Sequence, residues 1–131
     1  MNKTRVLIVD DEIGFTRLVK LTLEKSGNYE VCEENDAGKA WLTARSFKPD
    51  IVFLDIVMPR MDGGEVAQQI RSDPTLSAAP IVFLTAIVSQ QESQTQLGGF
   101  PFLAKPVSLA AITRCIEEQL RLGPGSVPDQ A

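Results

Sequence analysis

Three short segments of this chain are almost wholly apolar and do not alternate with polar residues. They are RVLIV at 5–9, DIVFL at 50–54 and PIVFL at 80–84, and they are rich in Val, Ile and Phe. Continuous apolar runs of this length are typical of parallel strands that are covered on both faces. We therefore expect a sheet whose central strands lie between two layers of helix.

Helical spacing of apolar and small residues separates these runs. The three sets are Phe15, Leu18, Val19, Thr22 and Leu23; Ala37, Ala40, Trp41 and Ala44; and Val66, Ala67 and Ile70. A last helix is expected to begin after Ser108 as its N-cap and to end near Gly123. Strands that alternate with helices predict an α/β fold with right-handed crossovers.

Two weaker strands complete the predicted sheet. YEVCEE at 29–34 alternates and carries charge, and FPFLA at 100–104 contains Pro101. Both features belong at the edges of a sheet. Placing these two strands outermost gives five parallel strands in the order 2-1-3-4-5, a doubly wound, flavodoxin-like sheet with helices on both faces.

The length of 131 residues fits one domain, which we expect over 1–121, with 122–131 as a disordered tail or the start of a linker. The apolar runs are about five residues long, whereas a membrane-spanning helix needs about 20. The N-terminal MNKTRVLIVDDE shows no secretion signal. We therefore expect a cytoplasmic protein without a membrane partner.

The net charge and the residue types limit which functions this chain can have. The net charge is −4 and histidine is absent, while Cys32 and Cys115 lie far apart in the sequence. A negative domain without a basic run is expected to make no direct contact with nucleic acid, because phosphate contacts dominate that affinity. Without histidine, any active site has to use carboxylates, hydroxyls and amines.

Polar side chains stand where the predicted strands end. Asp10 and Asp11 follow the first strand, Asp55 the third, Thr85 the fourth and Lys105 the fifth. Ligands of open parallel sheets bind at the carboxyl ends of the strands. Taken singly, each Asp or Thr is more readily explained as a helix cap. Taken together, the carboxylates repel one another and require a cation, and oxygen ligands alone favour Mg2+.

These groups suit phosphoryl transfer. Asp55 is the candidate nucleophile, because it directly follows a buried strand at the centre of the predicted crevice. Asp10 and Asp11 are better suited to holding the metal. The Lys105 ammonium and the Thr85 hydroxyl would bind the oxygens of the phosphoryl group.

Four fragments, VLIVDDE, IVFLDIVMPRMDGGE, IVFLTA and FLAKPV, resemble the receiver domain of two-component response regulators, over residues 5 to about 121. The resemblance implies a Mg2+-dependent signalling switch. Such a domain accepts a phosphoryl group from a sensor histidine kinase or a histidine phosphotransfer protein. It then presents a changed surface to a downstream effector domain or protein, and it is not an enzyme that turns over an external substrate.

The resemblance also implies roles for single residues. Asp55 corresponds to the phospho-acceptor, which also contacts the metal. Asp11 corresponds to a direct Mg2+ ligand and Asp10 to a ligand that acts largely through water. Val57 would contribute its backbone carbonyl to the metal.

Further residues correspond to the switch that reports phosphorylation. Thr85 resembles the hydroxyl that moves to the phosphoryl group, Lys105 the residue that forms a salt bridge with it, and Phe102 the switch aromatic. Pro106 would follow a cis peptide bond. From the sequence alone, Phe102 as ordinary strand core and Pro106 as a trans helix stop remain alternatives.

The segment SQQESQTQL at 89–97 departs from the family pattern. A capping-box pattern from Ser89 to Glu92 predicts a helix, but the segment has almost no apolar face. A homodimer formed on phosphorylation therefore stays an open alternative.

Two other functions compete with the switch. An aspartyl-phosphate phosphohydrolase typically carries a second Asp two positions after the nucleophile, where this chain has Val57. A receiver fold that serves only as an interaction module would not need all of Asp10, Asp11, Asp55, Thr85 and Lys105. The sequence therefore favours the phosphorylated switch.

Overall fold

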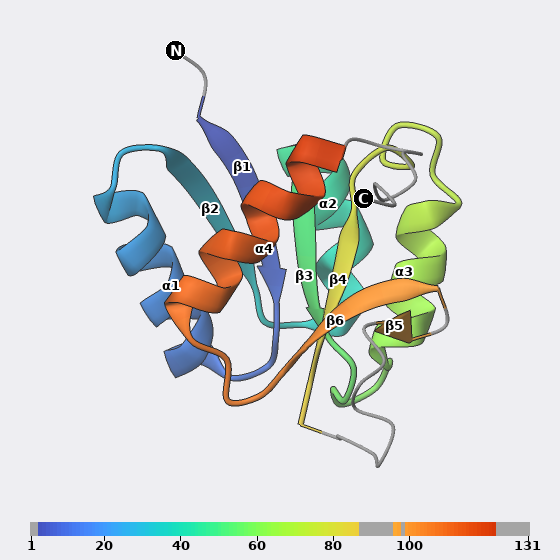
Figure 1. The fold of residues 1–131 in the computed structure, drawn as a ribbon. Helices are drawn as coiled ribbons and strands as arrows, with labels where there is room; N and C mark the ends of the chain where they lie inside the picture. The colour runs from blue at the N-terminus through green and yellow to red at the C-terminus, as the bar shows by residue number, and fades with distance from the viewer. Residues whose placement is uncertain (1–2, 87–95, 98, 123–131) are drawn as a thin grey trace.

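Strands and helices alternate along the computed structural model, which describes residues 3–86, 96–97 and 99–122. Figure 1 shows how they are arranged. The elements are β1 Thr4–Val9, α1 Ile13–Lys25, β2 Tyr29–Glu34, the 3-10 helix η1 Ala37–Lys39, α2 Ala40–Phe47, β3 Ile51–Asp55, α3 Gly63–Arg71, β4 Ile81–Thr85, β5 Gln96–Leu97, β6 Phe100–Ala104 and α4 Leu109–Leu122.

The sheet has the strand order β2-β1-β3-β4-β6-β5. The first five strands of this list pair in parallel. The predicted order 2-1-3-4-5 is confirmed, with β6 as the predicted fifth strand. The predicted edge strands, 29–34 and 100–104, coincide with β2 and β6.

The short strand β5 is a difference from the prediction. Gln96 and Leu97 belong to the segment expected to be helical, but they pair antiparallel with β6, opposite Pro101 and Phe100. An edge strand offers unpaired backbone groups, and a neighbouring extended segment satisfies them. The rest of the predicted helix, from Ser89 through residue 95, lies outside the described residues.

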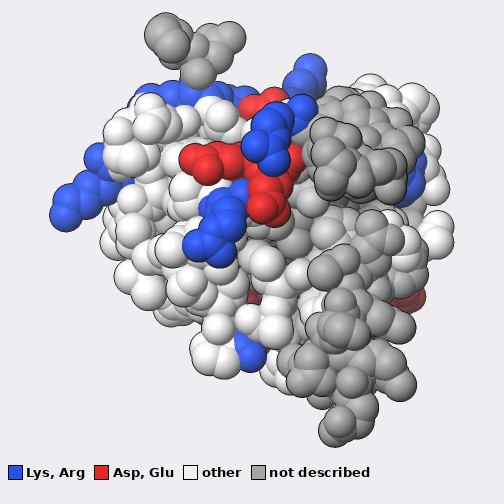
Figure 2. Space-filling model, viewed as in Figure 1, with Lys and Arg blue, Asp and Glu red and all other residues white. Residues whose placement is uncertain are grey.

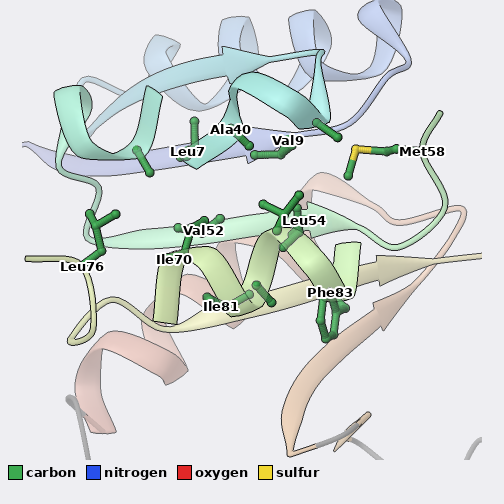
Figure 3. Packing of buried hydrophobic residues seen from close by; sticks show 14 residues of the cluster. Leu7, Val9, Ala40, Val52, Leu54, Met58, Ile70, Leu76, Ile81 and Phe83 are labelled. Atoms are coloured by element: carbon green, nitrogen blue, oxygen red, sulfur yellow. The ribbon is translucent and has the colours of Figure 1, made fainter. Parts of the chain in front are cut away.

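The strands are buried on both faces. Leu7, Val52 and Ile81 point to the side of α2 and α3, whereas Val6, Ile51 and Val82 point to the side of α1 and α4. Successive residues of a strand face opposite sides of the sheet, so two covered faces give a continuous apolar run. Figure 1 shows the two helix layers, and Figure 3 shows the core on the α2 and α3 side.

Helix α1 is rotated relative to the predicted apolar face. Thr16, Val19 and Leu23 are its buried residues, whereas Leu18 keeps 56% of its surface exposed. The buried Thr16 hydroxyl donates to Glu33 Oε1 at 2.8 Å. A tertiary hydrogen bond thus satisfies a polar side chain on the face of this helix that meets the sheet.

Local capping residues begin the helices that follow β3 and β6. Asp62 Oδ1 accepts from Glu65 N in a capping box at the start of α3. Ser108 Oγ accepts from Ala111 N at 3.0 Å, which confirms the predicted cap of α4. Within the described residues, no helix is long and apolar enough to cross a membrane. The predicted tail from residue 123 onward lies outside them.

Candidate functional site

Strand register brings the polar residues at the strand ends together. Val9 of β1 pairs with Leu54 of β3, so Asp10 and Asp55 are the next residues on adjacent strands. Carboxylate oxygens of Asp10, Asp11 and Asp55 all lie within 4.8 Å of one another. Neighbouring parallel strands are about 4.8 Å apart, which accounts for this close approach. The acidic cluster expected from the sequence is therefore present.

Asp10 is completely buried and every polar atom that it carries has a contact. Its Oδ1 accepts from the backbone N–H of Glu12 at 2.9 Å. Its Oδ2 forms an ion pair with Lys105 Nζ at 2.7 Å, with no hydrogen bond from the described residues. A buried carboxylate without a cation would be costly, so the ion pair with Lys105 offsets part of the cost of burying Asp10.

Lys105 reaches three carboxylates from the end of β6. Besides Asp10, its Nζ lies 3.2 Å from Glu12 Oε1 and 3.7 Å from Asp55 Oδ1. Burial by itself would lower the pKa of Lys105, but the close ion pair with Asp10, followed by the charge of Asp55 and the contact with Glu12, raises that pKa above its usual value. The ammonium is therefore held in its charged form beside Asp55.

The surroundings of Asp55 disfavour the ionised form of its carboxyl group. Burial first, and then the charge of Asp10, raise its pKa from 3.8 to about 6, although the ammonium of Lys105 acts in the opposite direction. The backbone N–H of Val57 donates to Asp55 Oδ1 at 3.4 Å. A cation bound at this cluster would favour the ionised carboxylate, which is the form that can act as a nucleophile.

Asp55 opens onto a cleft of about 700 Å³. The cleft contains acidic, basic and apolar groups, and Val57 at its rim keeps 62% of its surface exposed. Asp55 can therefore be reached from solvent through this cleft. The residues that line it are Asp11, Glu12, Phe15, Asp55, Val57, Ala86, Lys105, Pro106 and Val107.

The predicted switch residues lie on adjacent strands. Thr85 ends β4 and is buried, and it pairs with Ala104 of β6. The Thr85 carbonyl accepts from the backbone N–H of Lys105 at 2.8 Å. Phe102 is partly buried and packs against the core on the α2 and α3 side. The peptide bond between Lys105 and Pro106 is cis.

Two residues of the site were given no role from the sequence. Glu12 precedes α1 and contacts Lys105, and the Phe15 ring has the Lys105 ammonium 5.5 Å from its centre. Glu12 directly follows the two predicted ligands in the sequence, and this position already indicates that it lies at the same site. Phe15 was counted as helix core, because spacing alone does not distinguish a ring that packs on the sheet from one that faces a cation.

The Response regulator receiver domain family matches residues 6–117 of the chain. Among relatives, the chain is 34% identical over 123 residues to the alkaline phosphatase synthesis transcriptional regulatory protein PhoP of Bacillus subtilis, covering 92% of this chain and 50% of PhoP. The chain thus spans about half the length of this and similar relatives.

Two solved structures show the same fold. The chemotaxis protein CheY4 of Vibrio cholerae has a TM-score of 0.78 and 28% identity, with 89% of this chain and 98% of that chain covered. The receiver domain of the sensor histidine kinase PA1611 of Pseudomonas aeruginosa has a TM-score of 0.76 and 25% identity, with 89% of this chain and 97% of that chain covered. It holds magnesium in its active site cleft.

The strand order, the acidic cluster and the family match lead to one conclusion: this chain belongs to the response regulator receiver domains of two-component signalling, a family of regulatory phospho-acceptor domains.

Proposed function

We propose that Asp55 accepts a phosphoryl group from a sensor histidine kinase or a histidine phosphotransfer protein, in a reaction that depends on Mg2+. The observation that carries this proposal is the position of the Asp55 carboxylate. It lies at the open cleft, with one of its oxygens within 4.8 Å of carboxylate oxygens of Asp10 and Asp11. The Lys105 ammonium lies 3.7 Å from Asp55 Oδ1.

The donor set fits Mg2+. Asp10, Asp11 and Asp55 offer carboxylate oxygens within 4.8 Å of one another, and hard oxygen ligands are those that Mg2+ prefers. We assign Asp11 and Asp55 as direct ligands, Asp10 as a ligand through water and Val57 as a carbonyl ligand. When bound, the ion supplies positive charge that neutralises the phosphoryl oxygens.

In the proposed reaction an ionised oxygen of Asp55 attacks the phosphorus of the donor phosphohistidine. A bond between that oxygen and phosphorus forms while the bond between phosphorus and the donor nitrogen breaks, and the electron pair returns to the donor imidazole. The Lys105 ammonium, held close to Asp55 by its ion pair with Asp10, offsets the charge that gathers on the phosphoryl oxygens.

The signal would pass from Asp55 to β6 through Thr85. In our proposal the Thr85 hydroxyl moves to the phosphoryl group, and the rings and backbone of the neighbouring strand adjust. The backbone link between Thr85 and Lys105 and the pairing of Phe83 with Phe102 support this route. Phe102 and the bond at Pro106 would then change the surface that an effector domain or protein meets.

We further propose that the chain regulates partners and does not turn over an external substrate. At the position two after Asp55, where a phosphohydrolase would place a general acid, Val57 offers only an apolar side chain at the cleft. Attack of Asp55 on a phosphate ester would therefore have no acid at this position to protonate the departing group. The Val57 side chain also cannot activate a water for hydrolysis of a phosphorylated Asp55, which favours a state that persists long enough for a partner to bind it.

The proposed partners are proteins, in the cytoplasm. On the face drawn in Figure 2, basic side chains stand next to acidic ones and do not form one continuous basic surface. The exposed charged residues of α4, which lies toward the viewer in Figure 1, are Arg114, Glu117, Glu118 and Arg121. This mixed surface supports protein docking by the receiver domain over direct contact with nucleic acid. Dimer formation on phosphorylation stays open.

The decisive experiment uses a small phosphodonor with and without Mg2+, followed by intact-protein mass spectrometry. We expect one added phosphoryl group on the wild-type chain in the presence of Mg2+ and none on Asp55→Asn. The matched control is Asp50→Asn, because Asp50 lies just before β3 and is exposed, outside the cleft. Labelling of Asp55→Asn at the wild-type level would remove the central claim.

A further inference from the structure

A side chain outside the acidic cluster holds the backbone directly after β1, at Asp10. Asn35 lies between β2 and η1, and both hydrogens of its side-chain amide are used. Its Nδ2 donates to the Asp10 carbonyl at 2.7 Å and to Thr16 Oγ1 at 2.9 Å. Asn35 thus connects the end of β1 with the first turns of α1.

The Thr16 hydroxyl continues this connection. Because Oγ1 accepts from Asn35, its own hydrogen is free to donate. The shorter of its two acceptor contacts is Glu33 Oε1 at 2.8 Å, against 3.2 Å for the Ile13 carbonyl. Glu33 Oε2 in turn accepts from Arg17 Nε at 2.9 Å. Thr16 is completely buried, so this hydroxyl has little freedom to exchange its partners for water.

The bond from Asn35 fixes the peptide between Asp10 and Asp11, because the Asp10 carbonyl that accepts it at 2.7 Å is part of this peptide unit. The preceding peptide unit is held as well, since the N–H of Asp10 donates to the Glu34 carbonyl at 3.1 Å. A peptide unit is planar, so fixing its carbonyl also fixes the direction in which the next residue leaves. Asp11 is exposed and would otherwise be free to turn away from Asp55.

We infer that Asn35 is a positioning residue for cation binding, which acts by holding the Asp10 carbonyl so that Asp11 faces the cluster, and that Thr16 keeps the Asn35 amide in place. This inference rests on the proposed function of the acidic cluster as a Mg2+ site. It adds that the affinity of the cluster for the ion is set partly from the connection between β2 and α2. Groups that orient metal ligands typically contribute about 10- to 100-fold in affinity.

The test is a titration of MgCl2 into the isotope-labelled 131-residue chain, followed by backbone amide NMR shifts. Asn35→Ala is expected to weaken Mg2+ binding about 10-fold, because nothing then fixes the Asp10 carbonyl. Thr16→Val should weaken it in the same direction, since valine has nearly the shape of threonine but no hydroxyl. Thr16→Ser keeps the hydroxyl and should restore wild-type affinity.

Thr43→Val is the matched structural control. The Thr43 hydroxyl also donates to a glutamate of β2, Glu34 Oε1 at 2.6 Å, but Thr43 lies on α2 and makes no contact with Asn35 in the described hydrogen bonds. Urea unfolding of both valine variants compares their stabilities. A merely structural role of Thr16 predicts that the two variants lose stability and retain Mg2+ affinity alike.

The outcomes separate the two claims. Weaker binding in Asn35→Ala and Thr16→Val, with wild-type binding in Thr16→Ser and Thr43→Val, supports the positioning role. Wild-type affinity in Asn35→Ala overturns it and leaves the proposed function intact. If Asn35→Ala does not fold, equal affinity of Thr16→Val and Thr16→Ser overturns the inference in its place. A wild-type protein that binds no Mg2+ and accepts no phosphoryl group overturns both.

Discussion

The Lys105 ammonium lies 2.7 Å from Asp10 Oδ2 and 3.7 Å from Asp55 Oδ1, so the lysine is paired more closely with the buried metal-side carboxylate than with the proposed acceptor. Lys105 thus serves as a counter-ion inside the acidic cluster. A phosphoryl group on Asp55 would have to compete with Asp10 for the same ammonium. The stability of the fold and the response to phosphorylation are therefore linked through one side chain.

Lys105→Met should destabilise the metal-free protein by about 2 kcal/mol, because it leaves the buried Asp10 carboxylate without its cation. Urea unfolding at pH 7 measures the loss. The exposed Lys39→Met is the matched control and should behave as wild type. Adding Asp10→Asn to Lys105→Met should recover part of the loss. A Lys105→Met protein as stable as the wild type would show that Asp10 needs no counter-ion.

The raised pKa of Asp55 predicts that the stability of the metal-free protein depends on pH. Its folded-state pKa is raised from 3.8 to about 6, so between these values the folded state binds more protons than the unfolded state. Ionised Asp55 therefore destabilises the fold, and its cost appears as pH rises from about 4 to 6. Asp55→Asn should be more stable than wild type by about 1–3 kcal/mol at pH 7, since one pKa unit corresponds to about 1.4 kcal/mol.

Denaturant titrations across this pH range would measure that difference. Below pH 4 the wild-type carboxyl is protonated, and the two proteins should converge. A difference in stability that is independent of pH would mean that charge at Asp55 is not its cause.

Asp11→Ala should abolish most of the Mg2+-dependent rise in melting temperature while leaving the fold intact or slightly stabilised. Asp11 is exposed, and its carboxylate lies within 4.8 Å of those of Asp10 and Asp55, so its removal relieves repulsion. Thermal melts with and without MgCl2 compare the variant with wild type. An unchanged Mg2+ shift would count against Asp11 as a ligand.

Gly63 is predicted to tolerate no side chain. A Cβ at this position would lie 2.5 Å from the Asp55 carbonyl oxygen and 2.8 Å from the Ile56 Cα, both of which are backbone atoms. Gly63→Ala should therefore shift the loop after β3, destabilise the protein by about 2 kcal/mol and slow phosphorylation of Asp55. In contrast, a Cβ at Gly14 meets nothing within 4 Å, so Gly14→Ala should be neutral or stabilising. Equal unfolding midpoints for the two variants would refute this account.

The apolar side chain of Val57 predicts slow loss of the phosphoryl group. Hydrolysis requires a water in line with the bond between Asp55 and phosphorus, and a valine at the cleft can only exclude that water. Ile87, two positions after Thr85 in the sequence, is the second apolar residue expected to flank the site, and it lies outside the described residues. A Val57→Asn, Ile87→Glu double variant should release phosphate faster than the parent. Release is followed from the purified phosphorylated proteins. No acceleration in the variant would mean that hydrolysis is controlled elsewhere.

The strand pattern shows how far local sequence can be used. The runs that end in Val9, Leu54 and Leu84 predicted the central strands. A strand that is covered on both faces has to be apolar at every position, and this is visible in the sequence. The carboxyl ends of parallel strands lie at one edge of the sheet, so the sequence alone predicts that Asp10, Asp55 and Lys105 lie close together. Periodicity was less reliable for α1, where Leu18 was expected inside and is largely exposed.

By itself, therefore, the sequence determined the fold class, the order of the strands and the chemical types gathered at their carboxyl ends, since these depend on burial patterns that repeat along the chain. The tertiary structure decided that Lys105 pairs with Asp10, that β5 follows the edge of β6, and that Asn35 reaches the Asp10 carbonyl. The two contacts of Asp10 join residues that are far apart in the chain, and β5 follows β6 because the edge of the sheet accepts an extended partner in place of the helix that the local sequence predicts. These contacts depend on distances between packed elements, and no local period or propensity encodes such distances.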